Sequence, residues 1–226
     1  MTNKMANPVS GSISSQKFVL SKAYLLLAVS FIPCALGALA GAVVNPMALL
    51  GGGWMGIILF FAFLYSMVFF IEKNRYNKIG IALLQVFTFS MGMMIGPVLG
   101  MLLGSAAGTQ IVFSAAIMTV AVFAAMTFAA HKSKADTAAM SRFLLVGAVV
   151  LMTAVIANLF FKIPAVSLAI SAVFVVFSSL MIMWQTKAVI EGGETSYISA
   201  ALTIFISIYN IFSNLLHLLM ALTGND

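Results

Sequence analysis

The last apolar segment of the chain carries polar side chains whose types and spacing could do chemistry. At 100° per residue they fall within an arc of about 80° on one helix, while the opposite face, with Ile204, Ile208 and Leu215, is apolar. We call them the polar stripe: Thr203, Ser207, Asn210, Asn214 and His217. We expect the helix to turn this stripe inward, toward partners within a bundle. Two roles stay open: hydrogen bonding between helices, and the lining of a polar cavity or leak path.

The ionisable groups limit that chemistry. His217 could sense pH, because the unperturbed pKa of histidine is about 6.5, or it could simply form hydrogen bonds. With His131 in a connection, the histidines make no metal site. The carboxylates all lie in connections, at a helix edge or in the C-terminal tail: Glu72, Asp136, Glu191, Glu194 and Asp226. We therefore expect no carboxylate proton relay and no acidic cation site inside the bundle.

Motifs of enzymes are missing from the sequence. It contains no HExxH, no GxSxG and no Walker loop. Ser207 and His217 are ten residues apart, about 15 Å along a helix, too far for a catalytic pair. We predict a protein that is not an enzyme and needs no cofactor.

The composition predicts which kind of secondary-structure element carries these residues. Of the 226 residues, 63% are hydrophobic and 7% are charged, whereas a soluble domain is about a quarter charged. Continuous apolar runs of helix length predict an all-α polytopic membrane protein, a bundle of seven transmembrane helices within residues 23–222. Residues 1–22 are predicted to form a flexible tail, and residues 223–226 a short C-terminal tail. The expected spans are 23–44, 49–71, 79–103, 109–130, 142–161, 165–184 and 198–222.

The basic residues predict the orientation. With the N-terminus in the cytoplasm, the tail places Lys4, Lys17 and Lys22 inside, and ten of the eleven basic residues lie on that side. Only Lys162 lies outside. This asymmetry explains the net charge of +6 by insertion into a lipid bilayer, so the charge does not require nucleic acid as a partner. Seven spans put the C-terminus outside, but a re-entrant last segment would move it to the other side.

The third apolar segment carries a glycine at every fourth position. These glycines make a smooth ridge on which another helix can pack closely: Gly92, Gly96, Gly100, Gly104 and Gly108. Pro97 lies on the same segment and is expected to kink it, either for packing or as a gating hinge. Gly37 and Gly41 repeat the close-packing pattern more weakly in the first segment.

Three stretches resemble one known family. They are IGPVLG (95–100), IEGGETSYI (190–198) and SIYNIF (207–212). They resemble the Bax inhibitor-1-like family, and within it the bacterial YccA branch. The resemblance implies a seven-helix fold with the last helix near the centre of the bundle, in a bacterial inner membrane.

The resemblance implies two alternative functions. Some bacterial members behave as pH-sensitive calcium leaks that depend on an aspartate pair, and Gln185 and Ser207 occupy the two corresponding positions here. Both are neutral, so the residues that would titrate and attract calcium are absent from those positions. This departure disfavours the leak.

The YccA branch is instead associated with the membrane-anchored ATP-dependent protease FtsH and its HflK–HflC partners. A modulator of FtsH is therefore the first expectation. Such a protease needs an unfolded cytosolic segment to grip, and the 22-residue tail would extend roughly 70 Å. On this hypothesis the tail engages the protease and the tightly packed bundle resists extraction.

Overall fold

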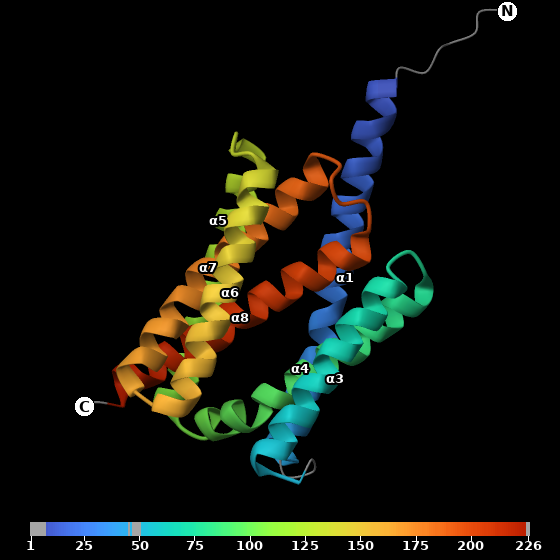
Figure 1. Cartoon of the computed structure of the whole chain (residues 1–226). Coiled ribbons are helices and arrows are strands. Elements are labelled where there is room, and N and C mark those ends of the chain that lie inside the picture. Colours follow the sequence, from blue (N-terminus) through green and yellow to red (C-terminus); the bar gives the residue numbers. More distant parts are fainter. Residues whose placement is uncertain (1–7, 45, 47–50, 225–226) are drawn as a thin grey trace, which may run out of the picture.

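The computed structural model describes residues 8–44, 46 and 51–224, and those ranges contain seven helices and no strand (Figure 1). The helices are α1 (Pro8–Val43), α3 (Gly53–Lys73), α4 (Lys78–Leu103), α5 (Ala106–Lys132), α6 (Thr137–Phe161), α7 (Pro164–Ile190) and α8 (Tyr197–Thr223). The prediction of an all-α polytopic membrane protein is confirmed.

Six of these helices, all except α3, are long and apolar enough to cross a membrane by length and composition. Helix α3 has 21 residues, about 31 Å at 1.5 Å per residue. Large apolar side chains are exposed along the helices, for example Phe143, Val146 and Val150 on α6. A water-facing surface would not carry such a continuous apolar patch, so lipid is the solvent for these faces.

Short connections start the helices with side-chain caps. The Asp136 carboxylate accepts hydrogen bonds from the backbone N–H groups of Ala138 and Ala139 at the start of α6. Ser105 and Ser196 cap α5 and α8 in the same way. These caps satisfy N–H groups that have no partner within the helix.

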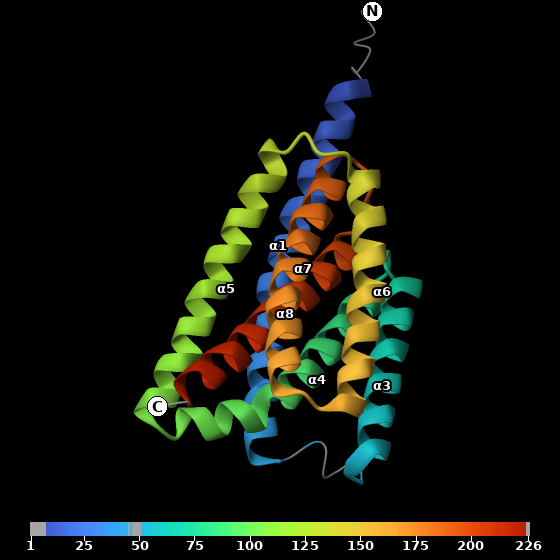
Figure 2. The same cartoon turned by 60° about the vertical axis from the view of Figure 1, so that its left-hand side comes forward.

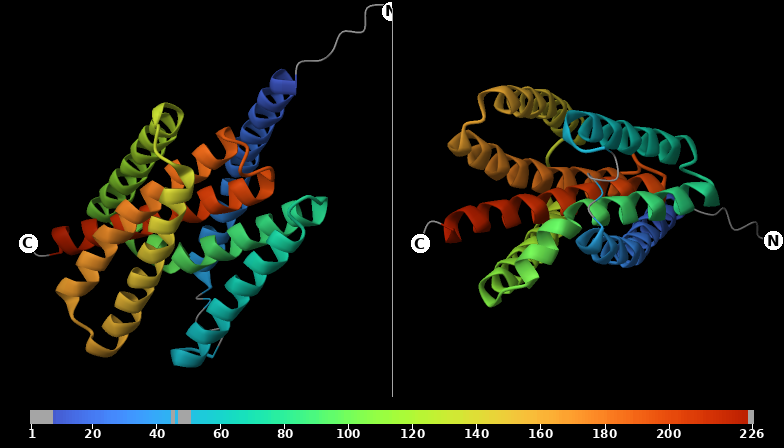
Figure 3. Two further views of the ribbon diagram at one scale, coloured as in Figure 1. Left: turned by 45° about the horizontal axis from the view of Figure 1, so that its top comes forward. Right: turned by 90° about the horizontal axis from the view of Figure 1, so that it is seen from below.

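Helix α8 lies at the centre of the bundle, as expected. It contacts α1, α3, α4, α5 and α7, and the right panel of Figure 3 shows α7 on one side of it and α1 with α5 on the other. Phe205 packs against Phe31 of α1 and Phe87 of α4. Helix α6 is peripheral and packs on α7 (Figure 2).

Helix α1 differs from the sequence prediction. We expected a flexible tail up to residue 22, but α1 begins at Pro8, so residues 8–22 are helical; we call these residues the α1 extension. Proline suits the first turn of a helix, and extending an existing helix needs no new nucleus. Val19 and Leu20 also pack against Ala23, Val189 and Ala200 at the ends of α7 and α8. Residues 1–7, including Lys4, lie outside the described part of the chain.

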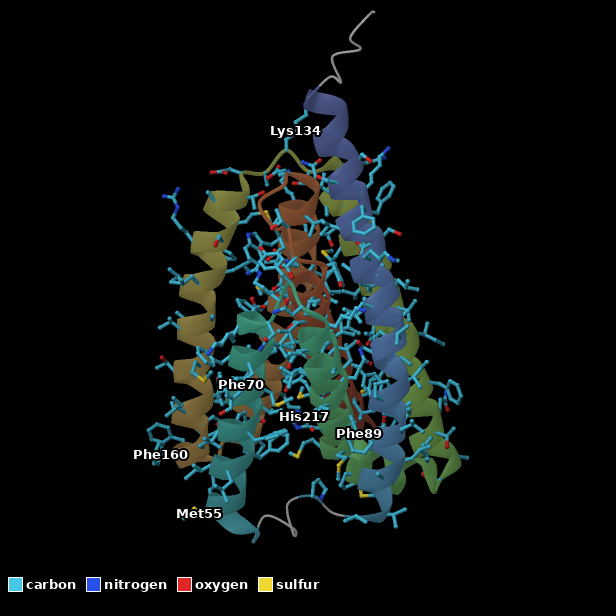
Figure 4. The ribbon with its side chains drawn as sticks, turned by 90° about the vertical axis from the view of Figure 1, so that its right-hand side faces the viewer. Met55, Phe70, Phe89, Lys134, Phe160 and His217 are labelled. Atoms are coloured by element: carbon cyan, nitrogen blue, oxygen red, sulfur yellow. The ribbon has the colours of Figure 1, made fainter. Side chains whose placement is uncertain are left out.

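All the described basic residues except Lys162 gather where α1 begins; we call this the basic end of the bundle. It holds the connections α3–α4, α5–α6 and α7–α8. Figure 4 shows Lys134 at this end and Met55 and Phe160 at the opposite end. Lys17 and Lys22 lie on the exposed surface of the α1 extension, where the Lys22 ammonium lies 5.6 Å from the centre of the Phe18 ring.

Candidate functional site

A network of charged groups ties the connections together at the basic end. Arg75, in the α3–α4 connection, pairs with Glu72 at 3.2 Å and with Glu194 of the α7–α8 connection. The Ser196 hydroxyl donates to the Arg75 carbonyl at 2.7 Å, and the Ser199 hydroxyl donates to the Glu72 carboxylate at 2.9 Å. Two connections that lie about half the sequence apart are thus held by one arginine.

The two carboxylates also stabilise the protonated, charged form of that arginine. Burial alone would lower the pKa of Arg75, but the negative charges of Glu194 and Glu72 outweigh it and raise the pKa above its ordinary value. The guanidinium is therefore charged throughout the physiological pH range. It acts as a fixed bridge rather than a proton donor.

A second group of contacts joins the α5–α6 connection to the same place. The Lys187 ammonium is buried, lies 2.6 Å from the Glu191 carboxylate and donates to the Ser133 carbonyl at 2.8 Å. Glu191 also accepts a hydrogen bond from Thr137. The bonds from Lys187 and Thr137 lower the pKa of Glu191, so this carboxylate is ionised at neutral pH.

Together these groups form a unit that we call the clasp: Glu72, Arg75, Lys187, Glu191 and Glu194, with the hydroxyls of Thr137, Ser196 and Ser199. Gly192 lies inside it with φ 80°, and a Cβ at this position would lie 2.9 Å from the Gln16 side chain of α1. The α1 extension therefore lies directly against the clasp.

The positions of these acids in or beside connections were expected from the sequence, but their partners were not. The available signal was the stretch IEGGETSYI, which supplies Glu191, Glu194 and Ser196. Because Arg75 and Glu194 are 119 residues apart, no local pattern could have joined them.

The glycine ridge packs where the sequence predicted close contact. A Cβ on Gly92 would lie 1.9 Å from the Cys34 carbonyl oxygen of α1, and a Cβ on Gly96 would lie 2.5 Å from that of Ala38. Gly37 and Gly41 of α1 meet the α4 backbone equally closely, and Gly100 meets Ala42. The predicted ridge and its weaker counterpart on the first segment are therefore the two faces of one contact.

Gly104 does not belong to this contact. It is the C-cap of α4, and a Cβ there would meet only the carbonyls of Met101 and Gly100 in its own helix. Gly108 packs instead against the backbone of Leu102. Helix α4 runs without interruption through Pro97, and the kink expected at this residue stays a prediction.

The polar stripe of α8 faces another helix only in part. Ser207 is buried, but its hydroxyl donates to the Thr203 carbonyl of its own helix, and Asn214 donates to the Asn210 carbonyl. His217 is exposed on its outer side and bonds across to Ser171 of α7 at 2.9 Å. The apolar face of α8, rather than the stripe, is the more deeply buried one.

The His217–Ser171 bond fixes the register of the antiparallel pair α7 and α8. Counting seven residues along each helix from this bond, an antiparallel register predicts that Ser178 lies level with Asn210, and seven more residues predict that Gln185 lies level with Thr203. Ser171, Ser178 and Gln185 are all buried. The sequence analysis missed this α7 partner of the stripe, although its seven-residue spacing was visible.

These levels define a polar seam: His217 with Ser171, Asn210 with Ser178, and Thr203 with Gln185. Gln185 and Ser207, the positions of the family aspartate pair, are both buried at the end of the seam nearer the clasp. Ser207 donates within α8 rather than to Gln185. No cluster of three or more metal-ligating side chains occurs among the described residues.

Known proteins resemble this chain over most of its length. Residues 16–224 match the model of the family described as Inhibitor of apoptosis-promoting Bax1. An uncharacterised protein of Neisseria meningitidis is 56% identical over 214 residues, 94% of each chain. The Escherichia coli protein named Modulator of FtsH protease YccA is 33% identical over 208 residues, 92% of each chain. By its sequence and its helical bundle, the chain belongs to the Bax inhibitor-1-like family.

Proposed function

We propose that this protein is a modulator of the membrane-anchored protease FtsH. The observation that carries the proposal is the 33% identity to the E. coli modulator, which extends over 92% of both chains and so includes at least part of every helix of the bundle. The proposal places the protein in the bacterial inner membrane with its N-terminus and its basic end in the cytoplasm. It makes the protein a non-enzymatic partner of FtsH and of HflK–HflC.

The proposal requires two properties: an N-terminal segment that the protease can engage, and a helical bundle that resists extraction from the membrane. Residues 1–22 supply the segment. Because residues 8–22 are helical, the protease must unwind them and break the contacts of Val19 and Leu20 with α7 and α8. The clasp then makes extraction harder, because three connections must be separated together.

The first experiment uses purified FtsH in proteoliposomes with a membrane substrate. We expect this protein, at equal amounts, to slow degradation of that substrate. Deleting residues 2–15 should abolish the slowing while the protein stays in the membrane. If the truncated protein inhibits as well as the full chain, the tail does not engage the protease.

The resistance of the bundle is tested separately. The double variant Arg75→Gln/Glu194→Gln removes the ion pair between the α3–α4 and α7–α8 connections and should turn a slowly degraded inhibitor into a readily degraded substrate. Lys162→Gln, at the opposite end, is the matched control and should inhibit normally. Equal degradation of both variants would contradict a role for the clasp.

The polar seam supports a second candidate, a leak for small solutes or ions along α7 and α8. Its α7 side chains, Ser171, Ser178 and Gln185, are buried within a membrane-spanning pair of helices, where polar groups commonly mark a pathway. The neutral Gln185 and Ser207 argue against calcium as the solute. Replacing Asn210 and Asn214 with leucine should abolish flux into liposomes; an unchanged rate would exclude the seam as the path.

A further inference from the structure

An apolar groove runs between α1 and α5 over the face of α8. Two adjoining cavities of about 370 Å³ and about 440 Å³ share Phe31, Thr119, Val120 and Ile208 in their walls. The first reaches Tyr24 toward the basic end, and the second reaches Ala38 deeper in the membrane. The right panel of Figure 3 shows α1 and α5 on the same side of α8, which forms the floor.

Small side chains open this groove to the surrounding lipid. Ala28, Ala35 and Ala116 line it, and the first two are exposed. From Tyr24 to Ala38 the groove follows α1 for about 21 Å, longer than the ~15 Å hydrocarbon depth of one leaflet. The dimensions and the apolar lining suit one extended acyl chain.

Polar groups lie at the end of the groove nearest the basic end. The Tyr24 hydroxyl lies 3.3 Å from the Thr186 hydroxyl. The Thr127 hydroxyl also lies in this wall; it is buried and has no hydrogen-bond partner in the described part of the chain. Thr127 is five residues before the end of α5, about 7.5 Å along the axis. A buried hydroxyl at this depth lacks the acceptor that a lipid ester or phosphate oxygen would provide.

Basic residues lie closer to the basic end than these hydroxyls do, on and beyond the same helices. Lys17 is exposed and lies seven residues before Tyr24, on the same face of α1. His131 follows Thr127 by one turn on α5, and Lys134 lies two residues beyond the end of that helix. Of the nearby acids, Glu191 is paired with Lys187, whereas Asp136 caps α6 and keeps its charge. Lys17 and Lys134 outnumber this one carboxylate, so the mouth of the groove has a net positive charge.

We propose that this groove is a binding site for one anionic phospholipid of the leaflet at the basic end. An acyl chain fills the space along Ala28, Ala35 and Ala116. The glycerol ester or phosphate oxygens accept a hydrogen bond from Thr127, and the phosphate lies near Lys17. The site differs from the polar seam, because it lies on the opposite, apolar face of α8.

Native mass spectrometry of the purified protein in detergent tests the acyl-chain part. The probes are phosphatidylglycerol and phosphatidylcholine with the same acyl chains, added at increasing concentrations. The variant Ala116→Phe fills the groove and should abolish the tightest bound lipid. Ala124→Phe adds the same bulk to an exposed position of α5 and should bind lipid as the unchanged protein does. Equal binding by both variants would overturn the proposal.

Two further variants test the headgroup. Lys17→Gln should weaken phosphatidylglycerol binding about fivefold, the effect of one basic residue near a membrane surface, with Lys162→Gln as the control. Thr127→Val should weaken binding of both lipids by about threefold to tenfold, the effect of one hydrogen bond. Thr153→Val, on the exposed face of α6, is its control. If the unchanged protein binds both lipids equally, or if Lys17→Gln has no effect, the groove holds no specific anionic lipid.

Discussion

At the scale of single residues, Gly92 shows how little space separates α1 from α4. A methyl group on its Cα would lie 1.9 Å from the Cys34 carbonyl oxygen and 2.8 Å from the carbonyl carbon. A backbone carbonyl inside a helix cannot move away by a side-chain rotation, so the two helices themselves must separate. In a membrane, where packing rather than water drives helix association, that separation removes much of the contact.

We therefore predict that Gly92→Ala lowers the free energy of unfolding by about 1–3 kcal/mol, the usual cost of overpacking. Thermal unfolding in detergent, or reversible unfolding in bicelles, measures the change. Gly104→Ala is the matched control on the same helix, because its Cβ would approach only carbonyls of its own helix, the nearer being that of Met101 at 3.3 Å. If the two variants are equally stable, the α1–α4 contact is looser than the structure has it.

Residue patterns in the sequence were informative only where the pattern is local. Glycines at every fourth position predicted close packing, and Gly92, Gly96 and Gly100 fulfil it. Gly104 continues the spacing but lies where α4 ends, so spacing alone could not exclude it. The pairing of Arg75 with Glu194 depends on how α3, α4, α7 and α8 meet, and only the folded chain supplies that information.

At the scale of elements, α8 is buried by its position rather than by its polar side chains. A central helix contacts neighbours on several sides, and its apolar face packs on α1 and α4 through Phe205. The sequence predicted one polar and one apolar face correctly. It also predicted that the polar face turns inward, but the apolar face is the more deeply buried one. In lipid an apolar face is equally stable outside, so the pattern alone does not decide which face packs against the bundle.

The register of α7 and α8 gives a prediction for this pair. In a Cys34→Ala background, Ser178→Cys and Asn210→Cys should form a disulfide under mild oxidation, because both positions lie on the seam at one level. Mass spectrometry of the digested protein detects the linked peptides. In the matched control, the cysteine on α7 is placed at Val176 instead of Ser178; Val176 lies on the same helix and is 61% exposed. Efficient linkage of Val176→Cys with Asn210→Cys would contradict the register.

The α1 extension shows why helix ends were predicted less well than helix centres. Residues 8–22 are polar and serine-rich, which indicated a tail. Their helix is stabilised by what it touches: Val19 and Leu20 pack on α7 and α8, and Gln16 reaches Gly192. These contacts are invisible to a local reading of residues 1–22.

At the scale of the whole molecule, the two ends of the bundle differ in kind. The basic end joins three connections and the α1 extension through the clasp and through Gln16. At the opposite end, Lys162 is the only basic residue among those that the structure describes. A bundle built in this way would resist force applied at the basic end more than force applied elsewhere, which is the property that the proposed role as an FtsH modulator requires.

The orientation of the whole molecule gives the last prediction. Ten basic residues against one should keep the basic end in the cytoplasm, because lysine and arginine near span ends resist translocation. In a Cys34→Ala background, Ala135→Cys, in the α5–α6 connection, should react with a membrane-impermeant maleimide only after the cells are opened. Ile163→Cys, in the α6–α7 connection, should react in intact cells once the outer membrane is permeable. The reverse pattern would place the N-terminus outside and remove the α1 extension from the reach of a cytoplasmic protease, so this one labelling experiment tests both the topology and the access on which the modulator depends.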